Sequence, residues 1–325
     1  MPTTLSPDVA HELRRRLADV CAQIGIDPGN ATLIKYTMNA VFLVPPVVLR
    51  LARGPHTTAL ASRVVAIASA LEDATAPTIR LADTVNSQPV HSDDWVATIW
   101  QQVPTIATEP KPADLAAPLR AIHALNLPEA PLAAWSPVEK FRRRINAAAA
   151  LPPAAAEELR QWSQADLHLD IKDLLDALRR RCDHLETQLT QVTWHMSSGV
   201  IHGDAHTGNV LLPTAPRRPS SNLPAVLCDL DSVCHGPREW DLVPTAHGAT
   251  RFGRSTTEYR AFVDAYGFDI TAWSGWPVLR DLRDLQLVTS TIDSLTGRPD
   301  VARELAHRIR TLLAGDTNAV WTRYT

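Results

Sequence analysis

A run of polar residues around position 204 lies between two apolar segments. The stretch VIHGDAHTGNVLL occupies residues 200–212 and places His202, Asp204, His206 and Asn209 between runs that predict short buried strands. A connection between two strands can hold such side chains toward a ligand. Taken singly, each residue also fits a polar loop whose hydrogen bonds are satisfied within the fold. The interpretation therefore depends on a second acidic segment.

That second segment is AVLCDLDSVCHGPREWDL, residues 225–242. A predicted buried strand, 225–228, runs into Asp229 and Asp231, and carboxylates at such a position are costly to bury unless they are paired or bound to a cation. If residues 210–212 and 225–228 form a hairpin around the Pro-rich loop 213–224, Asn209 lies beside Asp229. Amide and carboxylate oxygens suit a divalent cation, so the hairpin predicts a site for one such ion.

These residues are the parts that phosphoryl transfer needs, because positioning and charge neutralisation supply most of its catalysis. His202-Gly203-Asp204 followed by Asn209 has the spacing of a kinase-type catalytic loop. The pattern HGDxxxxN, then CDLD and GPREWDL, resembles the aminoglycoside phosphotransferase and choline kinase family. The segments NAVFLVPPVVLRL (39–51) and LRAIHAL (119–125) support the resemblance, as does the closing run from Tyr259 to Trp321.

The resemblance implies a reaction and a set of roles. The expected activity is transfer of the γ-phosphoryl group of ATP or GTP, with Mg²⁺, to a hydroxyl of a small molecule such as an aminoglycoside, an amino sugar or a related natural product. Asp204 would be the base and His202 a support for its loop, with Asp241 as a buried brace hydrogen-bonded to that loop. Asn209 and Asp229 would bind the metal, and Asp231 would be a further ligand or a substrate contact.

The segment expected to bind the nucleotide departs from the family pattern. The turn KYTMNAVF, which carries Lys35, Thr37 and Asn39, contains no glycine, although glycine eases close approach to phosphate. Arg50 stands where the family often has lysine, and the helix predicted at 58–72 offers it no acidic partner. Either Arg50 or Lys35 would contact phosphate. The hinge is expected near Trp100–Val103, so the nucleotide residues would also include Gln101 and Val103.

The predicted elements give a bilobal α+β fold of the protein-kinase type. A helix at 6–24, strands at 32–35, 40–44 and 47–51, a helix at 58–72, and strand-like runs at 76–83 and 93–103 precede a Pro-rich connector. From Pro112 onward, most of the sequence has the apolar spacing of helices. We expect a small antiparallel β-rich N-lobe at 1–103 and a larger, mostly helical C-lobe at 104–325, with the nucleotide in the cleft.

Composition narrows the classes of protein. The 325 residues are 45% hydrophobic with a net charge of −3, and arginine clusters such as 142–144 fit solvated helix faces, so we expect no nucleic-acid partner. Four cysteines without a CxxC pair favour free thiols in a reducing, cytoplasmic setting. No run approaches the length of a membrane span, so no membrane partner is expected. A monomer or weak dimer is expected.

Two alternatives to an active kinase stay open. His202, Asp204 and His206 could ligate Zn²⁺ in a hydrolase, although that leaves Asn209 and Asp229 without a role. A catalytically weak or silent nucleotide-binding relative is the other. For the acceptor, a cationic compound is modestly favoured, although arginines lie close to several of the acids that could hold it. Arg280 and Arg283 fit a solvated face self-paired with Asp281 and Asp284. The acids are Glu239, Glu258, Asp264, Asp269, Asp281, Asp284 and Asp293.

Overall fold

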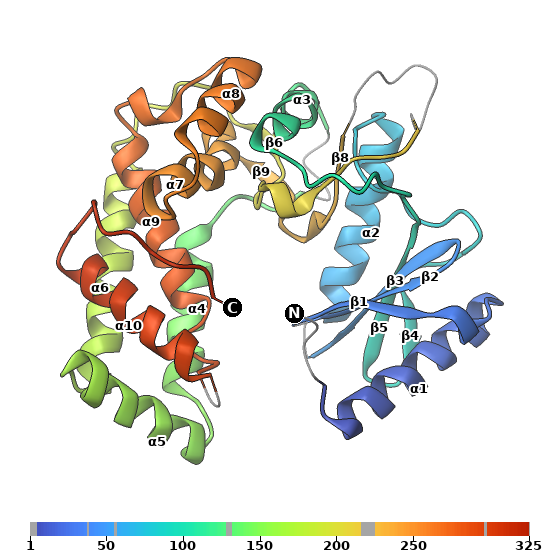
Figure 1. Cartoon of the computed structure of the whole chain (residues 1–325), viewed down its shortest axis with the longest axis horizontal. Helices are drawn as coiled ribbons and strands as arrows, with labels where there is room; N and C mark the ends of the chain where they lie inside the picture. The colour runs from blue at the N-terminus through green and yellow to red at the C-terminus, as the bar shows by residue number, and fades with distance from the viewer. Residues whose placement is uncertain are drawn as a thin grey trace. The chain divides into compact units, whose positions relative to one another are not determined.

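The computed structural model describes residues 5–37, 39–54, 57–127, 132–215, 225–295 and 298–324. The chain forms two compact units (Figure 1). The sheet unit comprises Met1–Ala133 and Thr207–Cys234, and the helical unit comprises Ala134–His206 and His235–Thr325. The chain therefore passes from one unit to the other within the predicted catalytic loop. The expected lobe boundary at residue 103 stays a prediction.

The sheet unit is built on a five-stranded antiparallel sheet with the order β1-β2-β3-β5-β4. The strands are β1 (Thr32–Tyr36), β2 (Asn39–Val44), β3 (Val47–Arg53), β4 (Val90–Ser92) and β5 (Trp95–Gln101). The first three follow the predicted runs, and Met38 of the predicted turn lies outside the described residues. The prediction of a strand at 76–83 is wrong, since only isolated bridges form there, at Thr78 and Leu81. Pro77 beside them has no amide to donate to a ladder. The sequence did not predict β4.

Successive side chains along each strand point to opposite faces of the sheet, and the two faces have different surroundings. Helix α1 (Pro7–Ile24) begins at Ser6, whose hydroxyl accepts the Val9 amide at 3.4 Å. Its apolar side packs in one core with Phe42 and Leu49. Because successive strand side chains point to opposite faces, Arg50 lies on the face turned away from α1. Helix α2 (Thr57–Asp73) lies on that other side in Figure 1. The remaining helix of the unit is α3 (Pro112–His123).

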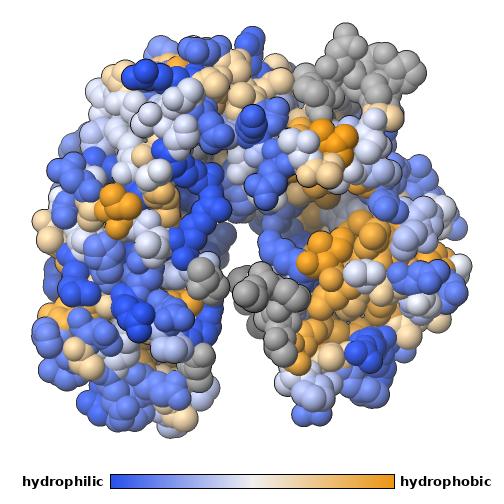
Figure 2. Space-filling model, in the orientation of Figure 1, coloured by the Kyte–Doolittle hydropathy of each residue, from blue (hydrophilic) through white to orange (hydrophobic). Residues whose placement is uncertain are grey.

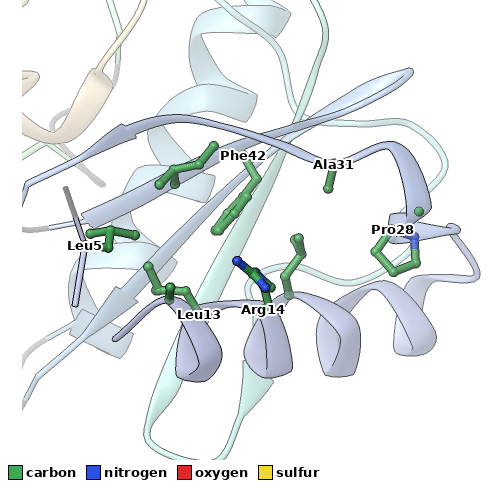
Figure 3. A pocket seen from close by; sticks show the side chains of 10 residues that line it. Leu5, Leu13, Arg14, Pro28, Ala31 and Phe42 are labelled. Carbon is green, nitrogen blue, oxygen red and sulfur yellow. The ribbon is translucent and has the colours of Figure 1, made fainter. Parts of the chain in front are cut away.

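A cavity of about 490 Å³ lies between α1 and the first strands (Figure 3). Leu5, Leu13 and Phe42 line it together with Arg14, and apolar surface gathers over this part of the sheet unit in Figure 2. None of the predicted site residues lines this cavity, since it lies on the α1 face of the sheet. It is therefore separate from the residues expected to do chemistry.

The predicted hairpin forms within the sheet unit. Strands β7 (Val210–Leu211) and β8 (Val226–Leu227) pair antiparallel, and residues 216–224 of their connection lie outside the described residues. On one side, the Ile79 amide donates to the Leu227 carbonyl at 2.9 Å. On the other, the Ile106 amide donates to the Leu212 carbonyl at 2.9 Å. The hairpin is thus held between the segment before the expected hinge and the segment after it.

The helical unit consists of one short strand pair and a set of packed helices. Strand β6 (Gly199–Ile201) pairs with β9 (Cys234–Gly236), and α4 packs against α6 and α9. Among the described residues, no helix is both long and apolar enough to cross a membrane. The helices of the unit are α4 (Pro137–Ala149), α5 (Pro153–Trp162), α6 (Ile171–Leu189), α7 (Val243–Arg251), α8 (Thr256–Tyr266), α9 (Trp276–Thr289) and α10 (Pro299–Leu313).

Candidate active site

The loop that carries Asp204 is fixed at its backbone by a buried acid. Asp241 is fully buried, and its two carboxylate oxygens accept the amides of His202 and Gly203, each at 2.7 Å. The indole of Trp240 donates to the Gly203 carbonyl at 3.1 Å. Gly203 has a φ of 81°, a left-handed conformation that glycine adopts without steric cost. The segment EWD therefore holds the turn directly before Asp204.

Asp204 itself is a half-exposed carboxylate beside positive groups. Its side chain is 36% exposed. One oxygen lies 3.4 Å from Nη1 of Arg283, and the other lies 3.7 Å from Nε2 of His206. Burial alone would raise the pKa of Asp204, but the nearby His206 imidazole and the Arg283 charge together hold it well below its usual range. Asp204 is thus ionised and able to accept a proton.

His202 lies behind this carboxylate. It is fully buried, and its Nδ1 accepts the Asp204 amide at 3.4 Å. This contact ties the imidazole to the backbone of the loop. The loop-supporting role of His202 stays a prediction.

Asn209 and Asp229 lie on the two strands of the hairpin in the sheet unit. The Cys228 amide donates to the Asn209 carbonyl at 2.9 Å, so Asp229 follows directly after the residue that faces Asn209. Asn209 is buried, whereas Asp229 is exposed. Asp229 also has a φ of 62°, a costly conformation for a residue with a side chain, and such strain clusters at functional sites. The two side chains supply the hard oxygen donors that suit Mg²⁺.

Arg50 and Asp231 form a pair that the sequence did not predict. The Arg50 guanidinium makes two parallel hydrogen bonds to the Asp231 carboxylate, with Nη1 at 2.5 Å from Oδ1. The two residues are 181 positions apart, and both side chains are about four-fifths buried. The missing acidic partner for Arg50 is thus Asp231, two residues after Asp229. From α2, Arg63 reaches the Asp231 carbonyl at 3.5 Å.

The other residues expected at the nucleotide lie at the two ends of the sheet unit's strands. Thr37 and Asn39 flank the β1–β2 turn, where the Thr37 amide donates to the Asn39 carbonyl at 3.1 Å. Lys35 is exposed and close enough to Cys228 to act on it electrostatically. The Cys228 pKa rises to about 12, chiefly through burial and the Asp229 charge, and Lys35 opposes the rise. Lys35 is thus near Cys228, the residue before Asp229, and its contact with phosphate stays a prediction.

The expected hinge follows β5. The Gln101 amide donates to the Arg80 carbonyl at 2.9 Å and the Gln102 amide to the Pro46 carbonyl at 3.0 Å, so these two amides are occupied. The Val103 amide has no backbone acceptor among the described residues. The contact of Val103 with a purine stays a prediction.

The acids and arginines of α9 do not form the solvated, self-paired face that the sequence suggested. Asp284 is 1% exposed, and its oxygens meet His247 at 2.6 Å and Arg251 at 2.5 Å. Asp281 pairs with Arg181 at 2.6 Å as well as with Arg280. Arg283 instead points to Asp204. The correction has a physical cause: α9 packs against α4, α6, α7 and α10, which leaves it little free surface.

The geometry gives the zinc alternative no support. In the part of the chain that the structure describes, no cluster of three or more His, Cys, Asp or Glu side chains could hold a metal ion. His202 is buried and accepts a backbone amide, so the three residues of that alternative do not converge. The oxygen donors Asn209 and Asp229 fit a hard divalent cation better than zinc.

Comparisons with known proteins agree with this geometry. The chain resembles a spectinomycin phosphotransferase solved with ADP and spectinomycin, at 17% identity and a TM-score of 0.59 over 93% of this chain and 98% of that one. It also resembles an amicoumacin kinase solved in complex with AMP-PNP, Ca²⁺ and Ami, at 13% identity and a TM-score of 0.62 over 96% of this chain and 98% of that one. A choline kinase from Streptococcus pneumoniae is similar too (14%, 0.59, 93% and 98%). No curated protein sequence matches the chain.

These solved structures share the fold, and the sequence supplies the family. The pattern of the phosphotransferase enzyme family matches residues 37–282, more than half of the chain. The matched residues run from the β1–β2 turn through the HGD loop and the hairpin to α9. The chain therefore belongs to the phosphotransferase enzyme family and has the kinase-like α+β fold of small-molecule phosphotransferases.

Proposed function

We propose that this protein is a kinase that transfers the γ-phosphoryl group of ATP, or alternatively of GTP, to a hydroxyl of a small molecule. The observation that carries the proposal is the fixed loop of Asp204, whose carboxylate is ionised while Asp241 holds the preceding amides. The loop continues directly into Asn209 and the hairpin that ends at Asp229. Family membership supports the same reaction class.

In the proposed reaction, each group of this chain has one task. Asp204 accepts the proton of the acceptor hydroxyl as its oxygen bonds to the γ-phosphorus, and the bond from phosphorus to the β–γ bridging oxygen breaks. The electron pair of that bond leaves with the nucleoside diphosphate. Asn209 and Asp229 would hold Mg²⁺, which neutralises phosphate charge when bound. Arg50 or Lys35 would contact the phosphates, and Val103 the purine.

The pair of Arg50 with Asp231 supports a division of labour between the two adjacent acids. A carboxylate engaged by two guanidinium hydrogen bonds is a weak candidate for a metal ligand, whereas the exposed Asp229 is a strong one. We therefore assign the metal to Asn209 and Asp229, and assign Asp231 the task of orienting Arg50. Arginine in this place can still clamp phosphate through its remaining donors.

A screen of the purified protein tests the proposal. Incubation with Mg²⁺ and labelled ATP or GTP, over a library of hydroxyl compounds, should give acceptor-dependent transfer that mass spectrometry detects as one added phosphoryl group. The two nucleotides compared at equal concentration identify the donor. A silent relative would bind nucleotide without any acceptor-dependent product, and a zinc hydrolase would act without nucleotide, so either result would refute the assignment.

A further inference from the structure

Two arginines of the helical unit converge on the neighbourhood of Asp204. Arg283 of α9 is 11% exposed, and its Nη1 lies 3.4 Å from Asp204 and 2.7 Å from the Gln286 side-chain oxygen. Arg144 of α4 donates to the Gln286 backbone carbonyl at 3.4 Å. Both guanidiniums are thus positioned through Gln286, one turn beyond Arg283 on α9. They place positive charge next to the proposed base.

Arg144 is half buried and, like Arg238 and Arg254 of the same unit, has no carboxylate partner among the described residues; what sets it apart is its contact with Gln286, the residue that also binds Arg283. Within the described residues, no acid lies at ion-pair distance from it, whereas Arg181 meets Asp281 and Arg251 meets Asp284. Burial lowers the pKa of Arg144, and the nearby charges of Asp293 and Asp204 only partly offset this effect. An incompletely compensated cation of this kind favours an anionic ligand, because a charge removed from water gains most from a directly bonded partner.

The acids that the sequence offered for a cationic acceptor are mostly engaged within the protein. Asp281 and Asp284 are paired with arginines, and Glu239 is fully buried against the amides of His195 and Met196. Asp269 accepts the Tyr259 hydroxyl and the Thr271 amide. Glu258, Asp264 and Asp293 stay exposed. The modest preference for a cationic acceptor therefore loses most of the carboxylates on which it depended.

We propose that the acceptor carries a carboxylate or another anionic oxygen group close to its reacting hydroxyl, and that Arg283 and Arg144 bind this group. The inference rests on the proposed kinase function and names the acceptor class for the same site. Arg283 orients the acceptor beside Asp204 while Arg144 supplies the second guanidinium. Paired guanidiniums suit the planar, bidentate geometry of a carboxylate, and they also bind phosphate monoesters.

The test compares acceptors that differ in charge. Four sets are offered with ATP and Mg²⁺: hydroxycarboxylates, sugar phosphates, neutral polyols, and amino alcohols with aminocyclitols. We expect transfer to hydroxycarboxylates or sugar phosphates, and the two sets distinguish the two sources of anionic oxygen. Conversion of an active hydroxycarboxylate to its methyl ester should raise the acceptor KM about 10–100-fold, since it removes the charge-assisted hydrogen bonds.

Variants of adjacent arginines assign the effect to the site. Arg144→Gln should raise the KM of an anionic acceptor about 10–100-fold, with kcat changed less, whereas Arg144→Lys should recover part of the loss. Arg143→Gln is the matched control, because Arg143 is the preceding residue of α4 but is 69% exposed and pairs with the exposed Glu139. Melting temperature and Mg²⁺-nucleotide affinity, measured in parallel, should be unchanged in both glutamine variants.

The outcomes separate this inference from the proposed function. Preferred transfer to a neutral or cationic acceptor, with a KM that Arg144→Gln leaves unchanged, would overturn the anionic acceptor while the kinase assignment stands. Absence of acceptor-dependent transfer in all four sets would count against both. Selective protection of the wild-type protein, but not of Arg144→Gln, against thermal unfolding by hydroxycarboxylates or sugar phosphates would support the site without an activity readout.

Discussion

Each of the two units contains acids that are engaged by other groups of the protein and acids that stay exposed. In the sheet unit, Asp231 is tied to Arg50, whereas the neighbouring Asp229 is exposed in a strained conformation. In the helical unit, Asp241 and Asp284 are almost fully buried, whereas Asp204 keeps more than a third of its side chain exposed. Within the segments proposed to form the site, the acids held by several partners are thus distinct from Asp204 and Asp229, the two acids for which we propose chemical roles.

The arginines of the two units differ. Arg50 in the sheet unit finds its carboxylate within the protein, so its orientation is fixed before any ligand arrives. Arg144 in the helical unit has no such partner among the described residues. In the proposed roles, Arg50 would meet the nucleotide with its orientation already fixed, whereas Arg144 would gain a carboxylate partner only from the acceptor. The following predictions test these contrasts, from the largest expected effect to the smallest.

Asp204→Asn should give the largest effect. Because the amide cannot accept the hydroxyl proton, turnover should fall roughly 10²–10⁴-fold while nucleotide affinity stays nearly intact. Steady-state kinetics and equilibrium nucleotide binding measure the two quantities. The control is Asp264→Asn, an exposed acid of α8 in the same unit. Near-normal turnover in Asp204→Asn would remove Asp204 from the reaction and break the distinction between accessible and buried acids.

Asp229→Ala should abolish metal-dependent nucleotide binding. The variant removes the exposed carboxylate that would hold Mg²⁺ against the phosphates, so added Mg²⁺ should no longer strengthen nucleotide affinity. Calorimetric titration with and without Mg²⁺ measures the effect, and Asp8→Ala in the first turn of α1 is the control. Activity of the wild type should follow Mg²⁺ or Mn²⁺. Activity that requires Zn²⁺ would instead restore the hydrolase alternative.

Asp284→Asn should lower the free energy of unfolding by about 3–5 kcal/mol. The change leaves Arg251, which is 2% exposed, as a buried charge without its carboxylate, and such losses fall in this range. Denaturant unfolding measures the effect. Asp300→Asn serves as the control, since the pair of Asp300 with Arg303 is about three-quarters exposed and should contribute within about 0.5 kcal/mol. Equal effects of the two variants would contradict the structural role of Asp284.

The pair of Arg50 with Asp231 should show a coupling free energy of about 1–2 kcal/mol. A double-mutant cycle of Arg50→Gln and Asp231→Asn, with Mg²⁺-nucleotide affinity and stability as readouts, measures it. A second pair on the same strand offers the matched comparison: Arg53 with Asp94, in which both side chains are more than half exposed. That pair should couple by less than about 1 kcal/mol. Coupling no larger for Arg50 than for Arg53 would deny that burial fixes the Arg50 orientation.

The sequence predicted the elements and motifs whose signal is local. Three strands and the α1 and α2 helices followed from alternation and helical spacing, and the hairpin beside Asn209 followed from its apolar runs. The pair of Arg50 with Asp231 joins residues 181 positions apart and leaves no local pattern. Arg144 and Arg283 resembled a solvated face because charge spacing on one helix cannot reveal which other helices cover it. Packing, and not composition, decides their role.

The smallest effect concerns the pH dependence of stability. Burial lowers the pKa of His247, with Asp284 partly opposing the shift, so the folded protein keeps the imidazole neutral where an unfolded chain would protonate it. Stability should therefore fall as pH drops below the ordinary histidine pKa of about 6.5. The Asp284 pKa is also lowered, because hydrogen bonds from His247 and Arg251 outweigh the opposing effect of burial. Its contribution is present above its unfolded-state pKa and is lost as pH falls through its lowered folded value.

The two groups act in separate pH windows, which allows a variant to distinguish them. As pH falls below about 6.5, the His247 contribution should change the free energy of unfolding by up to about 1.4 kcal/mol per pH unit, the limit for one proton. His247→Gln should flatten the profile in that window and leave the steeper decline near pH 4 and below. His184→Gln, on α6, is the control and should leave the profile as it is. Denaturant unfolding at closely spaced pH values measures the slope. A profile that His247→Gln leaves unchanged would show that burial does not lower the His247 pKa in the folded protein.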